Sequence, residues 1–98
     1  MAWQIIKIAN GHNSLDNSEL ESGDMFPILN QLKDHFQERF DKSDKFGLSF
    51  ATVGVDIRID GARLTVGWDN WSGLFIMAYD DDGDKIVMEI AEFFDAGS

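Results

Sequence analysis

The chain has 98 residues, 44% of them hydrophobic, which is enough for one core and too few for two domains of ordinary size. We therefore expect one acidic domain over residues 1–98. The absence of cysteine excludes disulfides, thiolate metal sites and a cysteine nucleophile. A net charge of −10 argues against nucleic acid and anionic membranes as partners. No segment has the apolar length of a membrane span or of a signal peptide, so we expect a cytoplasmic protein.

The first predicted element is a strand over residues 3–8, where β-branched and aromatic residues precede Asn10-Gly11. Residues 11–23 are polar and acidic, and only Leu15 and Leu20 could anchor them to a core. This composition is typical of a surface segment. We therefore predict a mobile loop.

A helix is predicted to begin at Asp24 and to end near Ser43 to Gly47. Asp24 can cap it, and Pro27 falls in the first turn, where the missing N–H breaks no helical hydrogen bond. Apolar residues recur every three or four positions and form one stripe, which consists of Met25, Ile28, Leu29, Leu32, Phe36 and Phe40. We interpret this helix as scaffold.

Residues 53–68 predict a β-hairpin, because two alternating runs flank Asp60-Gly61, a dipeptide that suits a two-residue type I′ turn. This turn fixes the register and places every apolar residue on one face. The cross-strand pairs are Ile59–Ala62, Ile57–Leu64, Val55–Val66 and Val53–Trp68. The preceding residues are out of phase, which predicts a bulge near Ala51 and Thr52.

Residues 74–79 predict a strand that is apolar on both faces, so it is either central in a sheet or meets a partner. Asp80, Asp81 and Asp82 then lead into a last helix and favour its positive end. The buried stripe of this helix is Ile86, Val87, Ile90, Phe93 and Phe94. The order β-α-β-β-β-α predicts an α+β fold, with an antiparallel sheet of about four strands and two helices on one face.

Sequence motifs for catalysis or metal binding are weak. His12 and His35 have no recognisable partners, and no nucleophile elbow or phosphate loop is present. Residues 78–89 partly match a calcium-binding loop, but Ala78 stands where the first ligand is needed. The alternative there is a polar turn with a helix cap. We predict no catalytic residue, no metal site and no cofactor, and thus a protein that is not an enzyme.

Trp71 is the first candidate for an interface anchor, because it falls in a tight turn where an indole is hard to bury. The alternative is that it folds over a sheet edge as a lid, whereas Trp68 is assigned to the core. Acidic residues flank this region, and from Leu64 to the end eight acids accompany Lys85 alone. They act either as a solubility device or as a surface for a basic partner. The predicted partner-binding set is Asp69, Trp71, Phe75, Met77, Tyr79, Asp80, Asp81 and Asp82.

A predicted hairpin, a Trp-containing turn, a strand and a closing helix, in a small acidic chain, resemble the plan of small bacterial toxin-immunity proteins. The resemblance implies a cytoplasmic, non-enzymatic inhibitor that binds a basic toxin or nuclease domain and occupies its surface. A second interpretation is a structural homodimer joined through open sheet faces or terminal strands. A small enzyme with His12 and residues 11–23 as its site is the third.

Overall fold

The computed structural model describes residues 3–9, 11–48, 52–71 and 73–96. Within these residues, six strands form one antiparallel sheet in the order β1-β2-β6-β5-β4-β3. The strands are β1 (Gln4–Lys7), β2 (Asn13–Asn17), β3 (Phe40–Leu48), β4 (Thr52–Ile59), β5 (Ala62–Asp69) and β6 (Gly73–Ala78). The α-helices are α1 (Met25–Phe36) and α2 (Asp81–Ala96), and short 3-10 turns cover Ser22–Asp24 and Gln37–Arg39.

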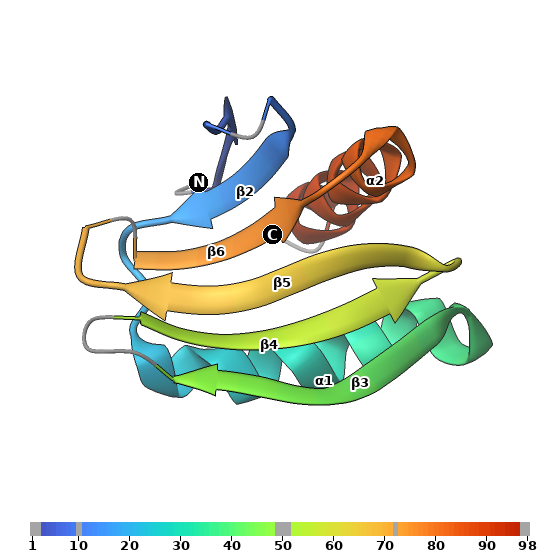
Figure 1. Ribbon diagram of the computed structural model, residues 1–98, viewed down its shortest axis with the longest axis horizontal. Coiled ribbons are helices and arrows are strands. Elements are labelled where there is room, and N and C mark those ends of the chain that lie inside the picture. The colour runs from blue at the N-terminus through green and yellow to red at the C-terminus, as the bar shows by residue number, and fades with distance from the viewer. Residues whose placement is uncertain (1–2, 10, 49–51, 72, 97–98) are drawn as a thin grey trace.

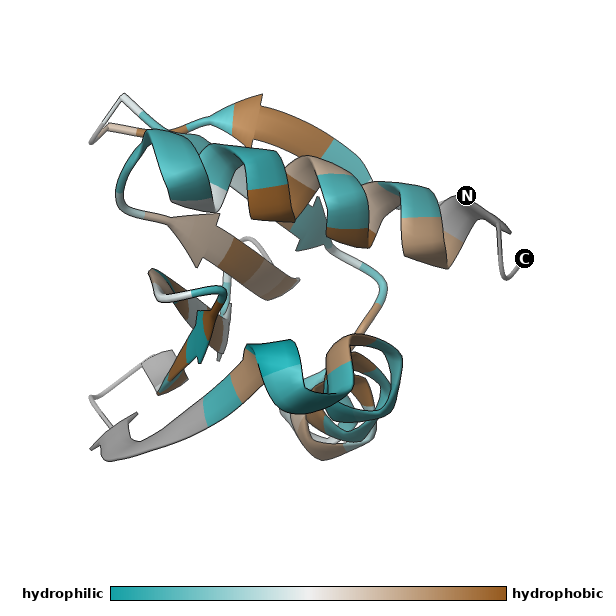
Figure 2. Cartoon of the chain, turned by 90° about the vertical axis from the view of Figure 1, so that its right-hand side faces the viewer, coloured by the Kyte–Doolittle hydropathy of each residue, from teal (hydrophilic) through white to brown (hydrophobic). Residues whose placement is uncertain are grey.

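Both helices lie behind the sheet in Figure 1, and the view turned by 90° in Figure 2 shows α1 nearly end-on and α2 lengthwise. The predicted α+β class is therefore confirmed, with two helices and a single antiparallel sheet. The predicted number of about four strands is wrong, because the described residues form six. Among these residues, no helix has the length and hydrophobicity needed to span a membrane.

One additional strand is β2, which replaces part of the loop predicted over residues 11–23. It lies inside the sheet, with Ser14 opposite Ile6 of β1 and Leu15 opposite Ile76 of β6. Gly11 has φ +85° in the turn between β1 and β2, a conformation that glycine adopts without strain. Leu15 alone gives β2 a buried apolar side chain, so its sequence lacks the alternation by which strands are recognised.

The other additional strand is β3, which begins at Phe40, where helix was predicted. Helix α1 ends four residues earlier, at Phe36, because Gln37 takes a positive φ of 54° and breaks the helical path. The pairing of β3 with β4 is irregular between Lys42 and Phe46. The bulge predicted near Ala51 and Thr52 falls partly outside the described residues, since Ala51 is not among them, while Thr52 pairs with Asp69.

The β4–β5 hairpin confirms the predicted register. All four expected pairs occur, and they are Ile59–Ala62, Ile57–Leu64, Val55–Val66 and Val53–Trp68. Asp60 and Gly61 both have positive φ, 54° and 82°, as a type I′ turn requires. Trp68 packs against the core, and its Nε1–H donates to the Leu20 carbonyl over 3.1 Å.

The core lies between the sheet and the two helices. A row across β2, β6, β5 and β4 consists of Leu15, Ile76, Val66 and Val55, each no more than 3% exposed. Against this sheet face pack the apolar stripes of α1 and α2, which bury Met25, Ile28, Leu29, Leu32, Phe36, Ile86, Val87, Ile90 and Phe94. Among the described residues, no helix covers the opposite sheet face (Figures 1 and 2), so side chains on that face can form a site.

Candidate functional site

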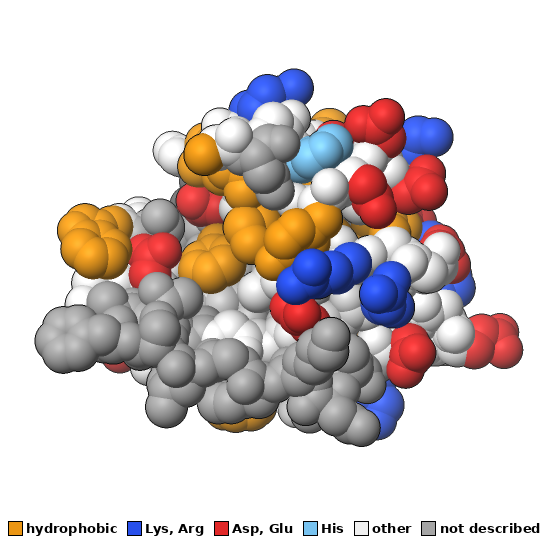
Figure 3. All heavy atoms as spheres, in the orientation of Figure 1, with side chains coloured by type: hydrophobic (Ala, Val, Ile, Leu, Met, Phe, Trp, Pro, Cys, Tyr) orange, Lys and Arg blue, Asp and Glu red, His pale blue; other side chains and the backbone are white. Residues whose placement is uncertain are grey.

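The helix-free face of the sheet carries a groove of about 480 Å³. Its walls come from β1, β2, the end of β5 and β6 with the residue that follows it. The lining residues are Ile6, Ile8, Ala9, Ser14, Asp16, Asp69, Phe75, Met77 and Tyr79. Figure 3 looks onto this face and shows hydrophobic side chains gathered in a band across it, with acidic side chains beside them.

Strand alternation explains why these residues meet. Phe75 lies opposite Asp16 and Met77 opposite Ser14, so the outward positions of β6 stand beside polar positions of β2. Ile76, between them on β6, points into the core and is fully buried, whereas Phe75 and Met77 are partly exposed. The strand that is apolar on both faces therefore buries one face completely and leaves the other half open.

Half of the predicted partner-binding set lines the groove, namely Asp69, Phe75, Met77 and Tyr79. Trp71 lies beside it in the β5–β6 turn, where its N–H donates to the Asp69 carboxylate over 2.9 Å. Its side chain is 82% exposed, so it does not cover a sheet edge as a lid.

The predicted acids Asp80, Asp81 and Asp82 follow the opposite end of β6 from Trp71. Asp80 caps α2 by accepting the Gly83 N–H over 2.7 Å, while Asp81 and Asp82 are exposed. The predicted set is thus divided among a groove, a turn and a helix start. Because residues 81–89 are helical, they do not form the calcium-binding loop that the sequence partly matches, and Asp80 instead serves as a helix cap.

The β1–β2 hairpin contributes five residues that the sequence did not predict as part of a site. They are Ile6, Ile8, Ala9, Ser14 and Asp16. The sequence signal for this hairpin is Asn10-Gly11, a dipeptide common in hairpin turns, which by itself predicts only that the first strand ends there.

Asp16 has an unfavourable electrostatic environment in this groove. Burial raises its pKa, and although the Ser14 hydroxyl donates to it over 2.5 Å and lowers the pKa, the nearby Asp69 carboxylate raises it again. The pKa of Asp16 is therefore above that of an ordinary aspartate. Within the described residues, no Lys or Arg forms an ion pair with Asp16.

The part of the same face over β4 and β5 is held together by polar contacts. Arg63 lies 4.1 Å above the centre of the Tyr79 ring and donates to Asp56 over 3.0 Å. The Thr65 hydroxyl is 2.7 Å from both the Asp56 carboxylate and the Tyr79 hydroxyl. Here one cation of the chain makes a cation–π contact with an aromatic ring and a charge-assisted hydrogen bond with a carboxylate.

His12 does have partners, contrary to the sequence-based expectation. Its Nδ1 is 3.0 Å from Asp84 and 4.0 Å from Asp81, and the Asn13 N–H donates to Asp84 over 2.7 Å. Burial opposes ionisation of Asp84, but these contacts and Lys7 outweigh it and lower its pKa. His12, Asp81 and Asp84 bring three potential metal ligands within 4.8 Å, and in this structure they join the β1–β2 turn to α2.

His35, the other histidine considered, is exposed on α1 and stacks on Phe93 of α2, with ring centres 4.1 Å apart.

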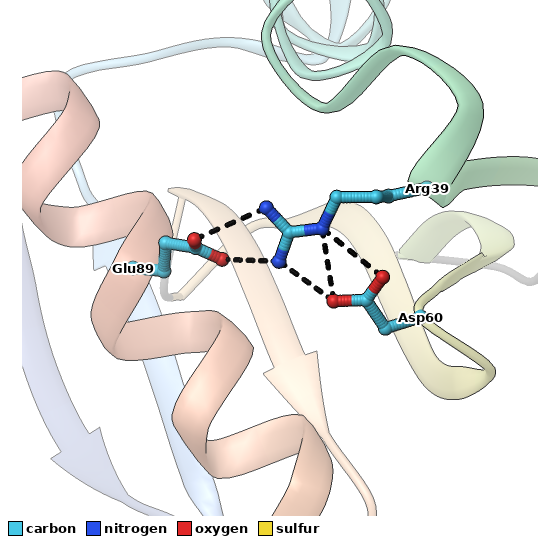
Figure 4. A network of polar contacts seen from close by, with 3 residues as sticks. All are labelled: Arg39, Asp60 and Glu89. Atoms are coloured by element: carbon cyan, nitrogen blue, oxygen red, sulfur yellow. Dashed lines mark hydrogen bonds and ion pairs between the residues drawn. The ribbon is translucent and has the colours of Figure 1, made fainter.

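A second cavity, of about 590 Å³, lies between α2 and the β4–β5 turn. Arg39 occupies its edge and binds Asp60 and Glu89 at once, with shortest distances of 2.6 and 2.9 Å (Figure 4). These bonds raise the pKa of Arg39 and lower that of Asp60. Since one guanidinium bridges a carboxylate of the hairpin turn and a carboxylate of α2, we interpret this network as a structural link between the two.

Comparison with known proteins gives no match to this chain: no protein-family model, no curated protein and no solved structure is significantly similar to it. The function must therefore be inferred from the geometry of the groove.

Proposed function

We propose that this chain is a non-enzymatic protein-binding module that docks a basic protein on its helix-free sheet face. Its specific form, which the resemblance of the sequence suggests, is an immunity-type inhibitor of a basic toxin or nuclease domain. The observation that carries the proposal is the groove itself, where partly exposed Phe75 and Met77 adjoin the carboxylates of Asp16 and Asp69.

The apolar part of the groove supplies most of the affinity for the docked partner, by slowing its dissociation. Aromatic and methionine side chains are enriched at interface centres, where exclusion of water makes their contacts strong. Trp71, which is 82% exposed beside Asp69, extends this surface beyond the groove.

The acidic residues select the partner and accelerate its arrival. The net charge is −10, and exposed Asp81 and Asp82 lie beyond the Tyr79 end of the groove. The negative electrostatic field of these acids attracts a cationic surface, and salt weakens that attraction. The same field repels nucleic acid, which fits an inhibitor that competes with nucleic acid for a basic surface.

Because the immunity interpretation expects the toxin to be encoded beside its inhibitor, the experiment uses the purified product of the reading frame adjacent to this one. Its binding to the full chain is measured by calorimetry. We expect Phe75→Ala combined with Met77→Ala to weaken binding by about tenfold or more, because both side chains lose their contact with the partner. Phe26→Ala is the matched control, since Phe26 is 57% exposed on α1, away from this face. Binding that the two groove substitutions leave unchanged would contradict the proposed site.

Association rates test the role of charge. Changing Asp80, Asp81 and Asp82 together to Asn should slow association and flatten its dependence on salt, with a smaller effect on dissociation. Because the asparagine side chain at position 80 can still accept the Gly83 N–H, the helix cap is retained. If neither the substitution nor the ionic strength changes the association rate, electrostatic steering is ruled out.

A homodimer is the alternative, and the exposed edge strand β1 favours it. All four of its residues, Gln4–Lys7, are exposed, and an edge strand can pair with a second copy. Light scattering of the full chain distinguishes the two functions. A stable dimer that Ile6→Glu dissociates and Trp71→Ala does not would support the homodimer, whereas a monomer would exclude it.

A further inference from the structure

On the helix-free face, one arginine of the chain contacts both an aromatic ring and a carboxylate. Tyr79 follows β6, and Arg63, near the start of β5, covers its ring at 4.1 Å while bonding Asp56. The guanidinium plane meets a π-face, and its N–H groups meet a carboxylate.

Phe75 stands in a similar setting that lacks the cation. It is on β6 on the same face as Tyr79, with Asp16 opposite it on β2. On its other side, β5 places Gly67, which has no side chain to lay over the ring. The ring is only partly buried, and Asp16 has no cationic partner within the described residues.

Asp69 adds a second carboxylate to the same groove. Burial raises the pKa of Asp16, and repulsion by the Asp69 carboxylate raises it further. Apolar walls with two neighbouring carboxylates at one place suit a ligand with a hydrocarbon stem and a positive end.

We propose that the groove receives one arginine side chain of the protein partner, with the guanidinium between Asp16 and Asp69 and the methylene stem on Phe75 and Met77. This inference depends on the proposed function, because the arginine belongs to the docked protein. It adds the chemical group that the groove recognises.

Arginine fits this groove better than lysine. Its planar fork has five N–H donors and can bond two carboxylates at the same time, while its flat face stacks on a ring such as Phe75. A lysine ammonium is a compact and strongly hydrated charge, so it gains less from an aromatic wall.

The test requires no partner protein. The full chain, labelled with ¹⁵N, is titrated with N-acetyl-arginine amide, and N-acetyl-citrulline amide serves as a control of nearly the same shape without the charge. We expect amide shifts in β2 and β6, with binding at least about tenfold stronger for arginine than for citrulline. We also expect the Asp16 pKa to fall when arginine binds.

Substitutions then locate the site. Asp16→Asn and Asp69→Asn should each weaken arginine binding by about tenfold. Glu92→Gln, which removes one exposed carboxylate on α2, should change nothing. Equal binding of citrulline or lysine amide, shifts confined to Asp80–Asp82, or full binding by Asp16→Asn would each overturn the proposal.

The result is separable from that of the proposed function. A groove that fails to bind arginine amide while the adjacent gene product still requires Phe75 and Met77 would leave the docking face intact and remove only its arginine specificity. Failure of the gene product to bind, with arginine amide bound at the groove, would instead contradict the proposed partner.

Discussion

The two faces of the sheet use the same strands and differ in what covers them. On β6, Ile76 is fully buried beneath the helices, while its neighbours Phe75 and Met77 remain partly exposed on the other side. On β2, Leu15 is 1% exposed in the core, and Asp16 faces the groove. One face is a completed core, and the other contains apolar side chains that the chain itself does not fully cover.

The carboxylates show the same difference. Asp60 is held by Arg39, and Asp84 by Asn13 and His12, so the pKa of each is lowered. Asp16 lies in the groove with a raised pKa. Links between elements therefore stabilise their acids, whereas the groove destabilises one, as is common at binding sites.

The largest expected effect separates the two faces on a single strand. Ile76→Ala should lower the free energy of unfolding by about 2–5 kcal/mol, because it leaves a cavity in the core. Met77→Ala should lower it by about 1 kcal/mol or less, since that side chain already contacts solvent. Urea unfolding followed by tryptophan fluorescence measures both. Equal losses would mean that the open face is a second core.

The best sequence predictions came from residues whose local chemistry allowed one outcome. Asp60-Gly61 fixed the register of β4 and β5, and the apolar periodicity of residues 86–94 located α2. The outward position of Phe75, Met77 and Tyr79 followed from alternation along one strand, and with Asp69 they line the groove.

The strands that were not predicted have weak local signals because tertiary contacts determine them. β2 contributes one buried apolar residue, Leu15, and is a strand because β1 and β6 pair with both its edges. Phe40 continues the helical spacing of α1, yet Gln37 ends the helix and Phe40 pairs with Ile59. Without β2, neither Asp16 nor the groove wall formed by the β1–β2 hairpin could be predicted.

Asp84→Asn gives the next largest effect and tests the carboxylates that hold elements together through hydrogen bonds. The folded pKa of Asp84 is below the ordinary value of about 3.9, so its contribution is present above that pH and is lost as the pH falls through the folded pKa. We expect the substitution to lower the free energy of unfolding by about 1 kcal/mol at neutral pH. Urea unfolding at neutral pH and at a pH below the folded pKa measures the difference in unfolding free energy between the variant and the unaltered chain. This difference should disappear at the acidic pH.

The control for this substitution is Asp82→Asn, which changes an exposed acid in the same first turn of α2 and should have little effect. A loss of stability as large as that of Asp84→Asn would show that the negative charge near the helix start, and not the link to His12 and Asn13, is responsible.

The smallest effect has the opposite sign, and it bears most directly on the groove. Since the folded pKa of Asp16 is raised, folding becomes less favourable as the pH rises from about 3.9 through that folded pKa. Asp16→Asn removes this penalty while its amide oxygen can still accept the Ser14 hydroxyl. At neutral pH the variant should be more stable, by about 0.5 kcal/mol or less because the groove is open to solvent. Urea unfolding between about pH 4 and 7 checks this. A less stable variant at neutral pH would mean that the groove already compensates Asp16, and the reason for an incoming cation would be gone.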